Sequence, residues 1–300
     1  MPLPALAEPK SFSQKAIGFC KGTLSFGTLF LLIIFFNLIQ VLSILLVPIS
    51  RSLVRKINRE LANTWWCLSD IWAEKLWNID IKHFGDKIPA KENAFVFCNH
   101  QEMTDITVLF RLGREKGRLG DFKFFVKDPL KYIPGVGWGM VFLDCIFLKR
   151  NWNKDKQKIK SLFSKFTRDN IDIWLISFVE GTRSREHKLA ASQKYAAANG
   201  LEPLQHVLTP RTKGFVASLH GLRDHLDAVY DVTIGYSKGV PTLWQWCKGY
   251  VKEVHVNITR HPIEALPTSD EETAKWLQER FVVKDQLLEN FYTTGSFEKT

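Results

Sequence analysis

One histidine and one aspartate stand where a general base and its orienting carboxylate could form. His100 and Asp105 are five residues apart in the segment 97–105, which leads from an apolar run into a helix-like one. An imidazole works as a general base when one ring nitrogen faces the proton and a carboxylate holds the proton on the other. The spacing occurs once in the chain. It predicts a local His–Asp dyad, although a purely structural pair has the same pattern.

Further motifs place basic residues and glycines near the ends of predicted strands. They lie in the segments 131–138, 147–150, 177–183 and 207–214. Arginine and lysine side chains that converge at neighbouring strand ends can clamp a phosphate, and glycine lets the backbone approach it closely. Open α/β sheets bind their ligands at the carboxyl ends of strands. These motifs therefore predict a phosphate site beside the His–Asp pair.

The order of these motifs resembles that of the glycerolipid acyltransferases. The likeness covers about residues 50–295 and is closest to the lysophosphatidate and lysocardiolipin acyltransferase branch. The residues that carry it are Asn99, His100 and Asp105, then Ile133, Pro134, Phe147 and Arg150, then Glu180, Gly181, Thr182 and Arg183, and finally Pro210 and Gly214.

This resemblance implies an O-acyltransferase that moves a fatty acyl group from a thioester to a lysophospholipid hydroxyl. His100 would be the general base and Asp105 would orient it, without a covalent acyl-enzyme. Arg150 and Arg183 would hold the substrate phosphate, and Glu180 would shape the glycerol site. The substrate-binding set that the resemblance implies is Asn99, Arg150, Glu180, Gly181, Thr182, Arg183 and, more weakly, Lys213.

The resemblance also implies the reaction partners. The acceptor would be 1-acyl-glycerol-3-phosphate, giving phosphatidic acid, with lysocardiolipin, lysophosphatidylglycerol and lysophosphatidylinositol as alternatives. The donor would be acyl-CoA, or an acyl carrier protein. The resemblance implies no cofactor, since acyl-CoA is a substrate. We expect no structural metal, because the five cysteines are far apart and form no Cys-x-x-Cys pair. Their spacing also favours a reducing compartment.

Short apolar runs alternate with helical stretches after residue 79, which predicts an α/β domain. The resemblance implies a glycerolipid-acyltransferase-like sandwich with a central mixed sheet flanked by helices. Residues 185–203 are expected to form the longest loop. Predicted strands are 94–98, 122–126, 145–148, 173–178, 229–236 and 254–258, and predicted helices are 106–112, 155–167, 214–226, 273–281 and 284–292.

An apolar segment near the N-terminus predicts a membrane anchor. Residues 22–50 carry no charge, and a span needs roughly 20 apolar residues. Asn37 and Gln40 are costly in lipid, so a re-entrant hairpin remains an alternative to one span. Basic residues are denser after this segment than before it, which favours a cytoplasmic catalytic domain. The compartment would be the bacterial inner membrane or the endoplasmic reticulum.

A second N-terminal segment predicts an amphipathic helix at the membrane interface. Apolar side chains recur at steps of three and four between residues 53 and 76, including Trp65 and Trp72. Packing against the domain core is an equally good interpretation. We therefore divide the chain into an anchor (1–51), an interfacial helix with its connector (52–84) and an acyltransferase α/β domain (85–300).

The charge balance and one further motif leave other functions to consider. A formal net charge of +10 favours anionic lipid surfaces and phosphorylated substrates. A nucleic-acid role lacks a recognisable module. Residues 235–239 match the Gly-x-Ser-x-Gly pattern of serine hydrolases, but only Glu253 can precede a histidine in the order such a triad needs after Ser237. A non-catalytic membrane scaffold is the remaining alternative.

Overall fold

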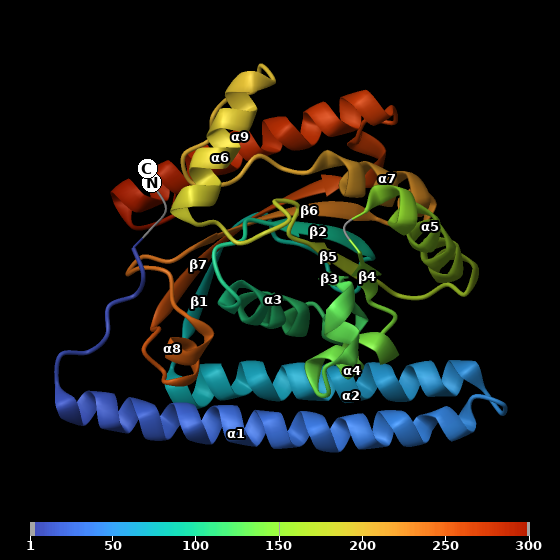
Figure 1. Cartoon of the computed structure of the whole chain (residues 1–300), viewed down its shortest axis with the longest axis horizontal. Helices are drawn as coiled ribbons and strands as arrows, with labels where there is room; N and C mark the ends of the chain where they lie inside the picture. Colours follow the sequence, from blue (N-terminus) through green and yellow to red (C-terminus); the bar gives the residue numbers. More distant parts are fainter. Residues whose placement is uncertain (1–3, 150, 299–300) are drawn as a thin grey trace.

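The computed structural model describes residues 4–149 and 151–298, in which seven strands form one mixed sheet (Figure 1). The strands are β1 (Asp80–Gly85), β2 (Ala94–Cys98), β3 (Phe122–Lys127), β4 (Ile146–Leu148), β5 (Trp174–Ser177), β6 (Ala228–Gly235) and β7 (Glu253–Pro262). Their order across the sheet is β1-β7-β6-β2-β5-β3-β4, and neighbours are parallel except β6 and β7. The predicted α/β sandwich with a mixed sheet is confirmed.

Helices cover both faces of this sheet. They are α1 (Phe12–Ser43), α2 (Arg51–Ile71), α3 (Thr104–Glu115), α4 (Val136–Phe142), α5 (Trp152–Arg168), α6 (Glu186–Ala198), α7 (Thr212–Leu222), α8 (Leu243–Cys247) and α9 (Asp270–Thr294). In Figure 1, α2, α3 and α4 lie below the sheet, and α6, α7 and α9 lie above it. The strand β2 is buried along its whole length because helices cover both of its faces.

Two apolar cores lie on the two faces of the sheet. One core joins Trp66 of α2 and Leu109 of α3 to Phe122 of β3. The other joins Phe163 of α5 to Phe281 of α9. Burial of such aromatic and aliphatic side chains stabilises the fold by about 25 cal/mol per Å² removed from water. The loop after β2 is therefore attached to a rigid, fully covered strand.

The structure corrects several predicted elements. The strand β1 was missed because its sequence, DIKHFG, is largely polar and it lies at the sheet edge. The expected loop 185–203 contains α6, whose only buried residues are Leu189 and Ala196, so it lacks an apolar stripe. The two helices predicted at 273–281 and 284–292 are the single helix α9. The six predicted strands are all present, with ends shifted by a few residues.

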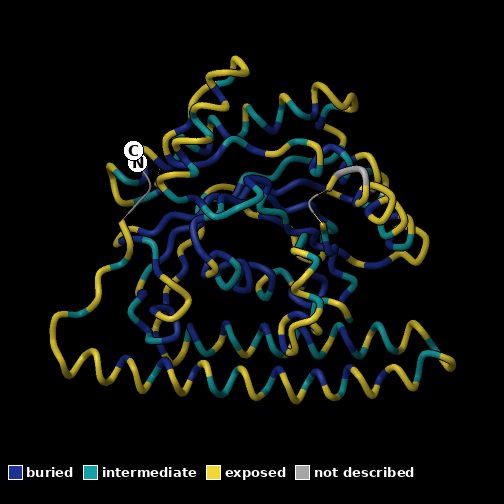
Figure 2. Tube along the Cα trace, in the orientation of Figure 1, coloured by how far each residue is buried: buried dark blue, intermediate teal, exposed yellow. Residues whose placement is uncertain are grey.

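The N-terminal segment forms a helical hairpin with α2. The helix α1 runs antiparallel to α2 along the lower side of the molecule (Figure 1) and is exposed along its outer side (Figure 2). It is long and apolar enough to cross a membrane by length and composition. Its polar residues Asn37 and Gln40 are buried, and Asn37 Oδ1 accepts the Gly135 N–H at 2.7 Å. Large apolar side chains such as Leu31, 70% exposed, point outward.

The amphipathic helix buries two different faces. Its predicted apolar stripe turns toward α1, where the Trp65 indole donates to the Leu29 carbonyl at 2.9 Å and the Trp72 indole to Ser25 Oγ at 2.9 Å. The face that packs on the domain instead carries buried residues such as Trp66, which contacts Phe110 and Phe122, and Asp70, which accepts from Arg111 of α3 at 2.9 Å. The strand β1 comes after this helix. All but its last residue belong to the segment 52–84, which the sequence analysis assigns to the interfacial helix and its connector.

Candidate active site

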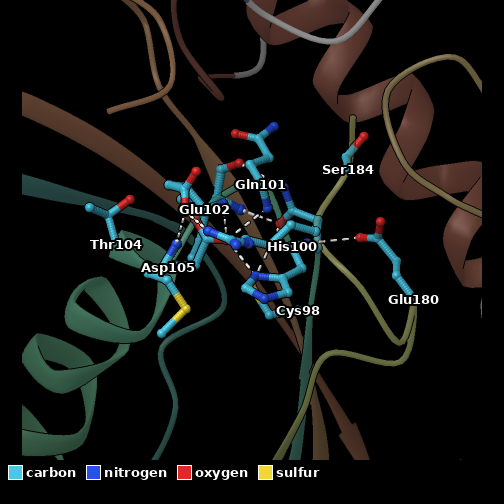
Figure 3. Close-up of polar contacts among 12 residues, drawn as sticks. Cys98, His100, Gln101, Glu102, Thr104, Asp105, Glu180 and Ser184 are labelled. Carbon is cyan, nitrogen blue, oxygen red and sulfur yellow. Dashed lines mark hydrogen bonds and ion pairs between the residues drawn. The ribbon is translucent and has the colours of Figure 1, made fainter. Parts of the chain in front are cut away.

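The loop between β2 and α3 brings the predicted histidine and aspartate together. His100 lies just past the end of β2, and Asp105 lies in the first turn of α3. Figure 3 shows the two side chains close together, and His100 Nδ1 is 2.9 Å from Asp105 Oδ2. The Asp105 side chain is 1% exposed and that of His100 is 13% exposed. The spacing in the sequence is therefore enough to form the pair.

The Asp105 carboxylate is held by more than the histidine. Its Oδ2 accepts the backbone N–H groups of Gln101 at 2.7 Å and Glu102 at 2.9 Å. Its Oδ1 accepts the hydroxyl of Tyr236 at 2.8 Å, from the residue that follows β6. Burial, and next the negative charge of Asp105, raise the pKa of Tyr236, so its hydroxyl stays a donor. These contacts fix the carboxylate plane and with it the loop.

This arrangement defines which nitrogen of His100 is free. An ionised carboxylate only accepts hydrogen bonds, so Nδ1 carries the proton and Nε2 carries the lone pair. The Phe178 ring stacks on the imidazole with 4.0 Å between centroids and holds its orientation. Among the residues that the structure describes, nothing is hydrogen-bonded to Nε2. The ring is set up to take a proton from an incoming hydroxyl group.

Glu180 and Asn99 tie this loop to the neighbouring strands. The Glu180 carboxylate accepts the backbone N–H of His100 at 2.8 Å (Figure 3) and that of Leu208 at 3.1 Å. Burial raises the pKa of Glu180 to about 8, although these two N–H donors act in the opposite direction. The Asn99 amide bonds the backbone of Ile234 in both directions, at 2.8 and 3.0 Å. Both side chains position the loop through the backbone.

The turn after β5 contains the predicted substrate-binding residues Gly181 and Thr182. Gly181 has a φ of +73°, and a Cβ there would meet the Arg211 side chain at 2.8 Å, so only glycine fits without strain. Lys188 Nζ donates to Thr182 Oγ1. The Ser184 N–H donates to the His100 carbonyl at 2.7 Å. This turn therefore lies directly beside the dyad, as its motif predicts.

Arg183 and a second arginine meet at one carboxylate next to the dyad. Arg183 Nη1 pairs with Glu102 Oε1, and Arg185 Nη2 lies 2.5 Å from Glu102 Oε2. Burial alone would raise the Glu102 pKa. The Met103 N–H and the two guanidinium groups outweigh it and hold that pKa below its usual value. Sequence patterns did not single out Glu102 or Arg185, because their pairing joins two separate loops.

The remaining predicted residues are placed differently. Lys213 is exposed in the first turn of α7, a helix that begins shortly after Leu208. Arg150 lies outside the described residues. Ser237 is exposed, and no hydrogen bond joins it to a histidine in the described part of the chain. Within residues 4–149 and 151–298, no group of three or more His, Cys, Asp or Glu side chains could hold a metal ion.

Comparisons with known proteins show the family of this chain. The family model "Acyltransferase" matches residues 80–237, and the model "Acyltransferase C-terminus" matches residues 247–300. The chain is 38% identical to 1-acyl-sn-glycerol-3-phosphate acyltransferase 2 of Brassica oleracea, over 87% of this chain and 68% of that protein. It is 33% identical to the human 1-acyl-sn-glycerol-3-phosphate acyltransferase delta, over 88% of this chain and 71% of that protein.

A solved structure supports the fold. The crystal structure of the 1-acyl-sn-glycerophosphate acyltransferase PlsC from Thermotoga maritima superposes with a TM-score of 0.55 and 21% identity, covering 93% of this chain and 97% of that one. The family model "Acyltransferase" spans residues 80–237, a range that contains the dyad and the motifs around it. This chain belongs to the acyltransferase family, in the branch of the 1-acyl-sn-glycerol-3-phosphate acyltransferases, and is an O-acyltransferase.

Proposed function

We propose that this enzyme transfers a fatty acyl group from acyl-CoA to the free hydroxyl of 1-acyl-glycerol-3-phosphate, giving phosphatidic acid. The observation that carries the proposal is the His100–Asp105 pair, in which Nε2 of His100 is left available. The names of the similar plant and human proteins supply the acceptor. No metal or cofactor is needed for this chemistry, because the thioester is already an activated acyl donor.

The proposed reaction is a direct transfer. His100 Nε2 removes the proton from the acceptor hydroxyl while the oxygen attacks the thioester carbonyl carbon. The tetrahedral intermediate then collapses, the C–S bond breaks and coenzyme A leaves as the thiolate. The imidazolium that forms is stabilised by Asp105 at 2.9 Å and returns its proton to the thiolate. A carbon–oxygen bond replaces a carbon–sulfur bond, with no covalent acyl-enzyme.

The acceptor phosphate is proposed to bind the turn after β5. Arg183 is partly exposed there, with 42% of its side chain accessible, and a guanidinium can bind two phosphate oxygens at once. Arg150 is proposed as a second ligand from its motif alone. Gly181 and Thr182 would line the glycerol portion, with Lys213 a more distant cation. Glu180 and Asn99 would act by holding the loop that carries His100.

Arg183→Lys should impair acceptor binding and turnover together. Lysine keeps the charge but cannot reproduce the planar two-point contact with a phosphate. A misplaced acceptor hydroxyl also spoils attack by His100, and a 1 Å error can cost on the order of 10²-fold in rate. Steady-state kinetics with each substrate varied should show a raised KM for lysophosphatidate, a lower kcat and little change in the KM for acyl-CoA. The reverse pattern would assign Arg183 to the phosphates of coenzyme A.

The enzyme is also proposed to rest on a phospholipid membrane through α1. The hairpin packs α1 along α2 and against α4 and α8, so its outward apolar face is free to enter lipid. An exposed apolar face of this size marks a membrane or protein contact. The acceptor and the acyl donor are both amphipathic lipids that concentrate there. The catalytic domain is proposed to face the cytoplasm, at the bacterial inner membrane or at the endoplasmic reticulum.

We expect the full-length protein to stay in the membrane fraction after high-salt and carbonate washing. Leu31 and Phe35 are 70% and 56% exposed on the same side of α1. Replacing both with lysine should release the protein into the wash, because lysine in an apolar helix costs about 2.5–3.5 kcal/mol. The matched control is Tyr195→Lys on α6, 57% exposed on the opposite side of the sheet. Release of the wild-type protein by salt alone would contradict the anchor.

A panel of acceptors tests the proposed function. The purified protein should be given labelled acyl-CoA with lysophosphatidate, lysophosphatidylglycerol, lysophosphatidylinositol or lysocardiolipin. We expect the highest kcat/KM with lysophosphatidate. A higher kcat/KM with one of the other lysolipids would replace the proposed acceptor, and higher activity with acyl carrier protein would replace the donor.

A further inference from the structure

Glu102 lies between two arginines at the entrance to the dyad. Its Oε1 is paired with Arg183 and its Oε2 with Arg185, and its Oε1 also accepts the Met103 N–H at 2.9 Å. The Glu102 residue is 8% exposed, whereas the side chains of Arg183 and Arg185 are 42% and 41% exposed. A buried carboxylate thus faces inward while both of its partners remain open to a ligand.

Arg185 is the more firmly oriented of the two arginines. Its Nη1 donates to the carbonyl of Gln101 and to that of Ser184, each at 2.9 Å. These contacts fix the guanidinium plane against the loop that carries His100. Its Nη2 is then directed at Glu102 Oε2. An arginine held by two carbonyls presents its remaining N–H groups in a fixed direction, as an anion site requires.

Carboxylate and phosphate oxygens compete for the same guanidinium N–H groups. Two arginines and one glutamate carry a net charge of +1 in the free enzyme. A phosphomonoester such as lysophosphatidate carries about −1.5 to −2 near pH 7 and offers three terminal oxygens. It therefore brings more charge and more acceptor atoms to the two guanidinium groups than Glu102 does.

We propose that Glu102 is an internal anion that the acceptor phosphate displaces from Arg183 and Arg185, so that Arg185 binds this phosphate together with Arg183. In the free enzyme, Glu102 holds Arg183 and Arg185 side by side and lowers the affinity for the acceptor. In the complex, the phosphate takes its place. The inference rests on the proposed function, because it concerns how that acceptor binds.

The displacement leaves the dyad intact. Glu102 contributes to Asp105 through its backbone N–H, at 2.9 Å, and this contact does not involve its side chain. The Arg185 contacts to Gln101 and Ser184 are also independent of Glu102. A change in the Glu102 side chain is therefore expected to alter acceptor binding much more than the chemical step.

Two substitutions in the full-length enzyme test the proposal in opposite directions. Glu102→Gln removes the competing charge while keeping the side-chain shape, so the KM for lysophosphatidate should fall roughly 3-fold to 10-fold. Arg185→Gln removes a charge-assisted contact, so the same KM should rise on the order of 10-fold to 100-fold. Arg185→Lys should lie between wild type and Arg185→Gln. The KM for acyl-CoA should stay within about two-fold in all three.

Inhibition by inorganic phosphate provides a second readout with the same variants. Phosphate should compete with lysophosphatidate, more strongly in Glu102→Gln and more weakly in Arg185→Gln. Glu279→Gln is the matched control, because this glutamate is 63% exposed on α9 and pairs only with Lys275 at 3.9 Å in the described structure. We expect it to leave both constants unchanged.

The outcomes separate this inference from the function on which it rests. If the wild type acylates lysophosphatidate but Glu102→Gln raises its KM, Glu102 supports the site and the displacement is wrong. An unchanged KM in Arg185→Gln would likewise remove Arg185 from the phosphate site. A wild-type enzyme that acylates another lysolipid but not lysophosphatidate would instead overturn the proposed function. If Arg185→Gln folds poorly, the KM for lysophosphatidate in Arg185→Lys and in Glu102→Gln still tests the proposal.

Discussion

His100→Ala should lower the rate of acyl transfer by about 10²–10⁴-fold. The imidazole is the base that the dyad presents, with Nδ1 held by Asp105 and Nε2 left open. Alanine removes the base without disturbing the backbone contacts of residue 100 with Glu180 and Ser184. Thermal unfolding and membrane association should therefore stay close to wild type. Initial rates at saturating acyl-CoA and lysophosphatidate measure the loss.

The matched control for this variant is His220→Ala. His220 lies on α7 with its side chain 45% exposed, and it pairs with Asp270 at 3.1 Å. Loss of such an exposed pair should change stability by about 0–1 kcal/mol and leave turnover intact. Turnover near the wild-type value in a folded His100→Ala protein would exclude this histidine as the base.

Asp105→Asn should reduce turnover by a comparable or larger factor and also destabilise the loop. The carboxylate accepts four hydrogen bonds, from His100, Gln101, Glu102 and Tyr236. An amide nitrogen cannot accept, so one oxygen position becomes a donor that faces other donors. In serine proteases the equivalent Asp-to-Asn change leaves the geometry intact but gives the histidine the wrong tautomer, and it costs about 10⁴-fold in kcat. An unsatisfied buried donor adds a loss of about 1–3 kcal/mol in stability.

Tyr236→Phe separates the effect of Asp105 on turnover from its effect on stability. It removes the hydrogen bond to Oδ1 and a buried contact with the Thr104 hydroxyl at 3.1 Å, and it leaves the contacts of Oδ2 with His100 and the two backbone N–H groups. We expect turnover to fall less than in Asp105→Asn, and the thermal stability to fall by an amount typical of the loss of two buried hydrogen bonds. Equal turnover in Asp105→Asn and the wild type would show that Asp105 does not orient the base.

The parts of the site that are local in sequence could be predicted from it. β2 is an apolar segment that ends at Cys98 and is followed by polar Asn99, and the His–Asp spacing spans a single loop. The pairing therefore needs no knowledge of the rest of the chain. The turn at Gly181 could be predicted for the same reason. Gly181, which has a positive φ, and Arg183 lie within one short motif.

The parts that depend on tertiary contacts could not be predicted. Tyr236 reaches Asp105 only because β6 pairs with β2, although the two residues are 131 positions apart. Glu102 and Arg185 lie on the segments that follow β2 and β5. They meet because these two strands are parallel neighbours, so that the segments leave the sheet side by side. A polar edge strand such as β1 has no apolar period to reveal it. Helix α6 forms from alanine-rich sequence with high intrinsic propensity and little burial.

The release of coenzyme A with and without acceptor tests the proposed direct transfer most directly. Purified enzyme should be mixed with acyl-CoA, and free thiol should be followed with and without lysophosphatidate. We predict that thiol appears only with the acceptor, in equal amount to phosphatidic acid, and that His100→Ala abolishes both. A burst of thiol equal to the enzyme concentration without acceptor would contradict direct transfer, most clearly if it persisted in His100→Ala and vanished in Ser237→Ala.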